Sequence, residues 1–118
     1  MISMREAYEK IGADYDGASV RLMGEEMLAR FAFKFLDDES MDKFEAAMAA
    51  GDAESAFMAV HTLKGVSQNL GFDNLYEPAV VVTEALRNAD TVDGARDGMH
   101  ALRQQYAATM SALREAAE

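Results

Sequence analysis

The segment VHTLKGVSQNLG, residues 60–71, combines three residue types whose spacing could support chemistry on one face of a helix. Residues three and four apart are neighbours on a helix, so Lys64 and Gly65 would both lie beside His61. A neutral imidazole is a nucleophile that titrates near neutral pH, and it can accept a phosphoryl group whose oxygens an ammonium group stabilises. Gly65 costs the helix about 0.5–1 kcal/mol relative to alanine, and its missing side chain would let a second protein approach the ring. The spacing thus predicts an accessible nucleophilic histidine.

The helical phase of this segment predicts that His61 points towards solvent. At about 100° per residue, small and aliphatic residues gather on the opposite side; they are Ala56, Ala59, Leu63, Val66, Ser67 and Leu70. The residues on the histidine's own side are Glu54, Phe57, Met58, Lys64, Gly65 and Gln68. A histidine in an apolar run is most often a buried core residue, but this phase disfavours that interpretation. The other alternative is an ordinary polar surface residue, and it leaves the apolar Phe57 and Met58 beside the ring unexplained. Apolar side chains ringed by polar ones favour a docking surface.

Other site chemistries lack their motifs in this chain. The sequence HTLKG has no HExxH spacing for a metal, and no glycine-rich phosphate loop indicates an ATP site. No G-x-S-x-G serine is present, and the absence of cysteine excludes disulfides and thiolate sites. His100 has no Lys-Gly companion and is interpreted as a surface or half-buried residue. We therefore expect a protein that is not an enzyme in its own right and that binds neither a metal nor a cofactor.

Length and charge limit the possible partners. The 118 residues suffice for one domain with one hydrophobic core, spanning 1–118. Acidic residues outnumber basic ones 21 to 11, for a formal net charge of −10, which disfavours nucleic acid and anionic membranes. No apolar run approaches the roughly 18 residues of a membrane span, and the first residues contain no signal-peptide core. We expect a cytoplasmic monomer.

The elements that must position the histidine are all predicted to be helices. The chain has one proline and abundant Ala, Leu, Met, Glu and Arg, which favour helix almost everywhere. Ser40 and Asp52 are predicted N-caps, and Gly51 and Gly71 are predicted helix ends. The expected helices span about 3–12, a short one after 17, then 25 onward, 41–50, 53–70, 73–87 and 93–116. Pro78 predicts a kink or a late start in the helix from 73. Because the connections are short, we expect an antiparallel four-helix bundle with one or two short additional N-terminal helices.

The motif HTLKGVSQNLG resembles the signature of histidine-containing phosphotransfer (HPt) domains. Their pattern is a histidine followed by x-x-Lys-Gly and, further on, a Leu-Gly that ends the helix; the matching residues are His61, Lys64, Gly65, Leu70 and Gly71. The resemblance extends over most of residues 17–90. It implies a helical bundle that carries a phosphoryl group on His61 between the receiver domains of response regulators, or from a hybrid histidine kinase to one. The Mg²⁺ of the reaction would then belong to the receiver and not to this chain.

The resemblance also implies roles for residues outside the motif. Gln68 would help docking. If the turn at 71–73 folds the next helix back antiparallel, Thr83 lies roughly level with His61, where many family members have Glu or Gln bonded to the imidazole. Glu84 is the next residue, and Arg87 stands where several members keep a basic residue near the phosphate; an ordinary solvated role for Arg87 stays open. An alternative function is a non-phosphorylated helical adaptor that sequesters a kinase or receiver, although an adaptor has no need of the nucleophile.

Overall fold

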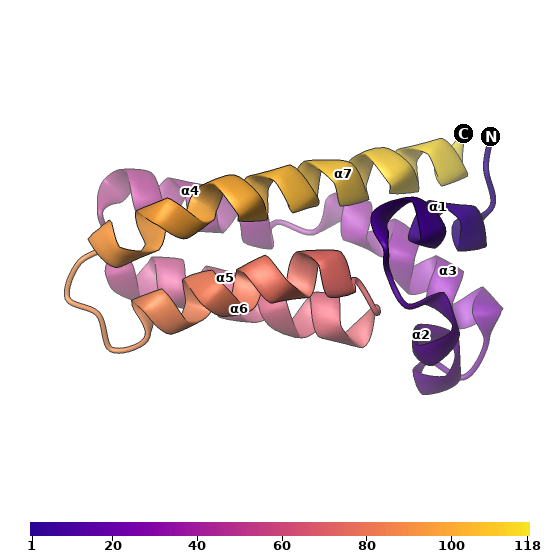
Figure 1. Cartoon of the computed structure of the whole chain (residues 1–118), viewed down its shortest axis with the longest axis horizontal. Coiled ribbons are helices and arrows are strands. Elements are labelled where there is room, and N and C mark those ends of the chain that lie inside the picture. Colours follow the sequence, from indigo (N-terminus) through magenta and orange to yellow (C-terminus); the bar gives the residue numbers. More distant parts are fainter.

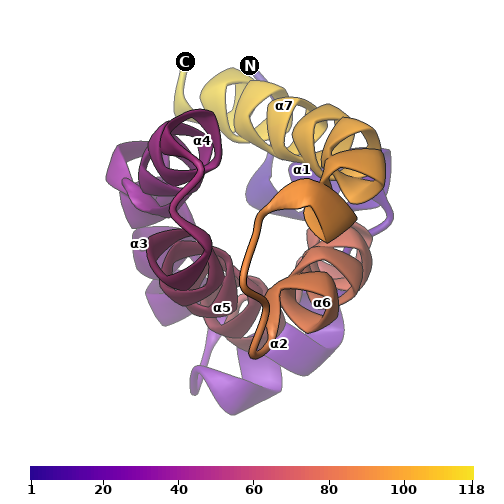
Figure 2. The ribbon, with the colours of Figure 1, turned by 90° about the vertical axis from the view of Figure 1, so that its left-hand side faces the viewer.

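The chain folds into an antiparallel helical bundle in the computed structural model, which describes residues 1–118. The four helices of the bundle are α4 (Ser40–Ala50), α5 (Ala53–Asn69), α6 (Asp73–Leu86) and α7 (Met99–Ala117). They surround a common core, with α4 and α7 on one side and α5 and α6 on the other (Figure 1, Figure 2). The predicted all-α bundle is therefore confirmed. None of the helices has the length and apolarity that crossing a membrane requires.

Three helices precede the bundle, in the three ranges that the sequence predicts before residue 40, although the expected architecture counted only one or two short additional helices. They are α1 (Met4–Ile11), α2 (Tyr15–Arg21) and α3 (Glu25–Lys34), and α3 runs into a short 3₁₀ helix, η1 (Phe35–Asp37). The chain breaks between α2 and α3 because Met23 and Gly24 both have positive φ angles, which no α-helix allows. These helices lie beyond the end of α5 and α6 that is opposite the α6–α7 connection (Figure 1).

The connections on either side of α5 follow the predicted helix signals. Gly51 and Gly71 have φ angles of 69° and 73°, in the left-handed region that glycine adopts at low cost. Asp52 caps α5, because its carboxylate accepts a hydrogen bond of 3.1 Å from the backbone N–H of Ser55. The bounds of the central helix were thus predictable to within one residue.

The start of α4 differs from the prediction. Ser40 is the first residue of α4 and not its N-cap. The carboxylate of Asp38 accepts a hydrogen bond of 2.8 Å from the backbone N–H of Ser40, so an aspartate two residues earlier satisfies the helix start.

Two further boundaries also differ. Residues 93–98 form a 3₁₀ helix, η2 (Asp93–Gly98), instead of the first turns of α7. A β-carbon on Gly98 would lie 2.9 Å from Cγ2 of Val82, so glycine permits a close approach to α6 there. The helix containing Pro78 begins at Asp73, so of the two expected alternatives, a kink or a late start, the late start does not occur.

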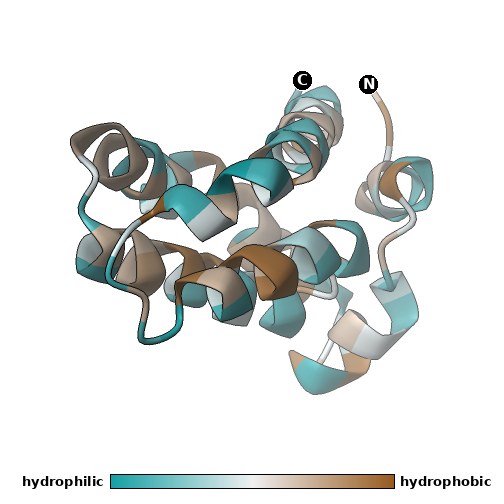
Figure 3. Ribbon diagram, turned by 60° about the vertical axis from the view of Figure 1, so that its left-hand side comes forward, coloured by the Kyte–Doolittle hydropathy of each residue, from teal (hydrophilic) through white to brown (hydrophobic).

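The core lies between the bundle helices and extends under the N-terminal ones. Its largest fully buried side chains are Tyr8, Phe35, Phe44 and Phe72. On α5 the predicted buried face is largely confirmed, but Val60 is fully buried while Ala59 and Val66 are only half-buried. Figure 3 shows hydrophilic and hydrophobic segments alternating along the helices, as amphipathic packing requires.

The N-terminal helices hold the C-terminal end of α5 in place. The phenol of Tyr8 donates a hydrogen bond of 2.7 Å to the carbonyl of Leu70, and burial raises the pKa of Tyr8 so that the phenol stays protonated. The Arg21 guanidinium donates to the carbonyls of Gln68 and Asn69 at 3.0 and 3.2 Å. A cation is favourable at a helix C-terminus, where these carbonyls have no partner within the helix.

Candidate functional site

His61 lies near the middle of α5 with its side chain exposed to solvent. Its ring stacks on that of Phe57, one turn earlier, with 5.5 Å between centroids and 14° between ring planes. Phe57 is half-buried against the core, so it provides a fixed surface for the imidazole. The stacking restricts the ring orientation while the edge of the ring stays open to an approaching group.

Lys64 and Gly65 follow on the same helix face. Lys64 is half-buried, whereas Gly65 is exposed. A β-carbon on Gly65 would meet no atom of the chain within 4 Å. The backbone there is ordinary helix without a positive φ, so neither conformation nor packing requires a glycine at this position. The open space lies where an incoming molecule would reach the histidine.

Two charged residues face this part of α5, namely Glu84 from α6 and Arg87, the C-cap residue that follows this helix. Glu84 accepts two hydrogen bonds from Arg87, one from Nε at 3.2 Å and one from Nη2 at 3.0 Å. The Arg87 guanidinium holds the pKa of the Glu84 carboxyl below its usual range, and the charges of Lys64 and His61 lower this pKa further. The Arg87 Cζ also lies 5.2 Å from the ring centroid of Phe57. The residues on this face of α5 and α6 therefore form one connected cluster, namely Phe57, His61, Lys64, Glu84 and Arg87.

The structure corrects our expectation for Thr83. Its side chain is fully buried, and its hydroxyl donates a hydrogen bond of 2.7 Å to the carbonyl of Ala79. Thr83 can therefore neither bond the imidazole nor contact a partner. The residue of α6 whose pKa the charge of His61 lowers is Glu84, one position later.

The helical phase of α6 could have identified Glu84. Apolar residues repeat along this helix at Leu75, Ala79, Val82 and Leu86, and all four are buried. Residue 83 falls beside that stripe, whereas residue 84 falls away from it. We placed residue 83 opposite His61 from the geometry of the turn at 71–73 alone. That prediction did not take into account the rotation of α6 about its own axis, which its buried apolar stripe determines.

The remaining predicted surface residues are exposed as expected from the helical phase. Met58 is 63% exposed, a large fraction for an apolar side chain, and Gln68 is exposed two turns after His61. Arg87 is also at the surface, engaged with Glu84. The second histidine, His100, is exposed in the first turn of α7.

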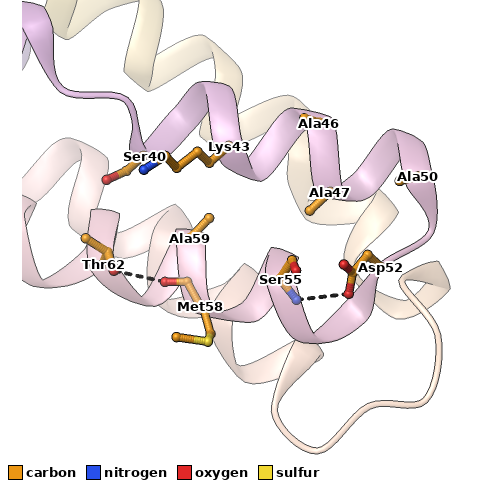
Figure 4. Close-up of a pocket in the computed structure, with 10 residues that line it drawn as sticks. All are labelled: Ser40, Lys43, Ala46, Ala47, Ala50, Asp52, Ser55, Met58, Ala59 and Thr62. Carbon is orange, nitrogen blue, oxygen red and sulfur yellow. Dashed lines mark hydrogen bonds between the residues drawn. The ribbon is translucent and has the colours of Figure 1, made fainter.

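A groove runs along the other side of α5, between this helix and α4 (Figure 4). Its volume is about 570 Å³, and four alanines leave it wide, namely Ala46, Ala47, Ala50 and Ala59. Met58 and Thr62 line its edge, whereas His61 does not. The groove therefore adjoins the candidate site without containing His61. No cluster of three or more His, Cys, Asp or Glu side chains in the chain could hold a metal ion.

The fold and the site together define a four-helix bundle that presents an exposed histidine in the middle of one helix. A family model described as the Hpt domain matches residues 32–116, which include α4, α5, α6 and all but the last residue of α7. The chain therefore belongs to the Hpt domain family, whose members act in phosphotransfer in two-component phosphorelays. No curated protein and no solved structure matches the chain significantly.

Proposed function

We propose that this protein is a histidine phosphocarrier, in which His61 accepts a phosphoryl group from the aspartate of a receiver domain or from a kinase. The group then passes to the aspartate of a response regulator. The observation that carries this proposal is the open space at Gly65 beside an exposed, stacked imidazole. Neither the backbone conformation nor the packing of this chain requires a glycine at position 65. The approach of a second protein to His61 would explain it.

The transfer step needs little from the carrier beyond the nucleophile. A lone pair of the neutral imidazole attacks the phosphorus of the aspartyl phosphate, so an N–P bond forms and the acyl O–P bond breaks. The leaving electron pair returns to the aspartate carboxylate. Lys64 lies one turn away and would stabilise the phosphoryl oxygens, while the receiver would supply the Mg²⁺. Return of the group to another receiver is the reverse of these bond changes.

The surface around the histidine suits docking of a receiver. Met58 and Phe57 provide apolar area next to the nucleophile, and Gln68 extends the same helix face. A partly apolar patch excludes water around the reacting atoms and strengthens the electrostatic contribution of Lys64. The phosphoryl group would thus travel within one protein–protein interface.

Mutation of the two histidines tests the proposal directly. The protein is incubated with receiver domains that have been charged with acetyl phosphate, and phosphate stable to base but labile to acid is assayed on the carrier. We expect His61→Gln to abolish this label and His100→Gln to keep it, because only His61 lies in the cluster with Lys64. The matched pair separates the nucleophile from a second exposed histidine of the same chain.

Transfer at the wild-type rate by His61→Gln would refute the proposal. If the wild-type protein bound receivers tightly but never became labelled, the adaptor function would be favoured instead. Receiver affinity is therefore measured beside the label for each variant.

A further inference from the structure

Glu84 places a negative charge next to a site that is to carry a phosphoryl dianion. Its carboxylate lies close enough to His61 and Lys64 for their charges to lower its pKa. A like charge near the ring opposes phosphorylation, and the chain as a whole is already acidic, with a net charge of −10. The carboxylate of Glu84 would not help to bind the phosphoryl group, so its position beside His61 needs another explanation.

Glu84 also binds Arg87, whose guanidinium lies beside the candidate site. Both of its oxygens accept hydrogen bonds from Arg87, and the pair is exposed, with 45% and 56% of the Arg87 and Glu84 side chains accessible. The guanidinium lies over Phe57, whose ring stacks on His61. The side chain of Phe57 thus connects Arg87 to His61. An exposed ion pair such as Glu84–Arg87 exchanges partners at little cost.

We propose that Glu84 and Arg87 form a clasp that opens when His61 is phosphorylated, with Arg87 leaving Glu84 for the phosphoryl oxygens. The inference rests on the proposed function, because it concerns the phosphorylated state of the same histidine. Glu84 acts as a positioning residue: it holds Arg87 near the ring in the free carrier and competes for it afterwards. The competition limits how strongly the carrier retains the group and so favours its transfer onward.

The charged groups facing the phosphoryl position come from several elements. Lys64 and Glu54 project from the same side of α5. Glu84 comes from α6, Arg87 is the C-cap residue of that helix, and Asp90 lines the same groove as Arg87. Among these, Glu84 is the acidic group with both oxygens on the arginine. Its removal should therefore change the phosphoryl environment more than removal of the other two carboxylates.

The test loads the carrier without a receiver. Potassium phosphoramidate phosphorylates histidine directly: the imidazole nitrogen attacks phosphorus, the P–N bond of the donor breaks, and ammonia leaves after taking up a proton. The second ionisation of the bound phosphoryl group is then followed by ³¹P NMR in wild type, Glu84→Gln, Arg87→Gln and the double variant. The Nε–H resonances of Arg87 and Arg103 are recorded before and after loading.

We expect Glu84→Gln to raise the acid constant of the phosphoryl group about two- to fivefold, because the dianion loses a repelling charge and gains the arginine. Arg87→Gln should lower the constant by a similar factor, and Glu84→Gln should have a smaller effect in that background. Loading should move the Nε–H resonance of Arg87. The effects should shrink in high salt, because the groups are exposed.

The ion pair between Arg103 and Glu45 provides a matched control. It has the same two-bond geometry, with both distances at 2.7 Å, but it joins α7 to α4 on the other side of the bundle (Figure 2). The Arg103 resonance should stay unchanged on loading, and Glu45→Gln should leave the phosphoryl ionisation at the wild-type value.

The clasp is overturned if loading leaves the Nε–H resonance of Arg87 unmoved. It is also overturned if Glu84→Gln changes the acid constant of the phosphoryl group equally in the wild-type and Arg87→Gln backgrounds. Failure of phosphoramidate to label His61 would overturn both the clasp and the phosphocarrier proposal. If the loaded protein shows the predicted coupling but no receiver exchanges the group, only the phosphocarrier proposal fails. Efficient exchange without the coupling leaves that proposal standing and rejects the clasp.

Discussion

Gly65 and Gly71 belong to the same motif, but their surroundings are opposite. Gly71 is buried, with a φ of 73°, and a β-carbon there would lie 2.5 Å from the backbone oxygen of Asp14 and 2.9 Å from Cβ of Ala18. Gly65 is exposed, has ordinary helical backbone, and would meet nothing within 4 Å. The chain's own packing requires the first glycine and gives no reason for the second. A glycine that the fold does not need is evidence for contact with another molecule.

The largest stability effect is expected at Gly71. Gly71→Ala should lower the free energy of unfolding by about 2–5 kcal/mol, because it adds left-handed strain to a clash with the backbone of Asp14. Gly51→Ala is the matched control: its φ is 69°, but a β-carbon there would meet nothing. That variant should lose only the strain, about 1–2 kcal/mol. Equal losses in urea unfolding would show that close packing is not what distinguishes Gly71.

A smaller loss is expected from the contact that holds the end of α5 beside Gly71. Tyr8→Phe removes the donor to the Leu70 carbonyl and leaves that buried oxygen without its partner. We expect about 1–3 kcal/mol of destabilisation, measured by the same urea titration.

Tyr15→Phe is the control for Tyr8, because the Tyr15 hydroxyl bonds the exposed carboxylate of Glu25 at 3.0 Å. It should change stability by less than about 0.5 kcal/mol. Similar losses for the two variants would mean that the N-terminal helices do not secure the end of α5. Phosphotransfer by either folded variant should stay at the wild-type rate, since neither residue lies near His61.

The parts of the molecule that short-range rules govern were predictable from the sequence. The bounds of α5 follow from Asp52 and Gly71, and the exposure of His61 follows from its phase against the buried Leu63 and Ser67. Long-range features were not predictable in this way. The burial of Tyr8 under Leu70 joins residues 62 positions apart, and no local pattern encodes that contact.

The same distinction applies to the site. Lys64 and Gly65 are placed by the helix that carries His61, so their positions needed only the 3.6-residue period. Glu84 and Arg87 come from a second helix, whose rotation relative to α5 is set by packing of its own apolar stripe. An error of one residue in that rotation exchanges the buried Thr83 for the exposed Glu84. Sites built from two helices therefore need the tertiary structure.

The most specific functional effect, with only a small change in stability, is expected at Gly65. Gly65→Ala should stabilise the protein by up to about 1 kcal/mol, because alanine loses less backbone entropy in a helix and no atom opposes its methyl group. Gly65→Gln should also fold normally, but its longer side chain would project beside the imidazole and slow single-turnover transfer from a receiver. Phosphorylation of this variant by phosphoramidate should continue, because a small donor still reaches the ring. A stabilised protein that accepts phosphate from the small donor but not from the receiver would assign Gly65 to partner access. Wild-type transfer by Gly65→Gln would remove that assignment, and with it the functional meaning of the contrast with Gly71.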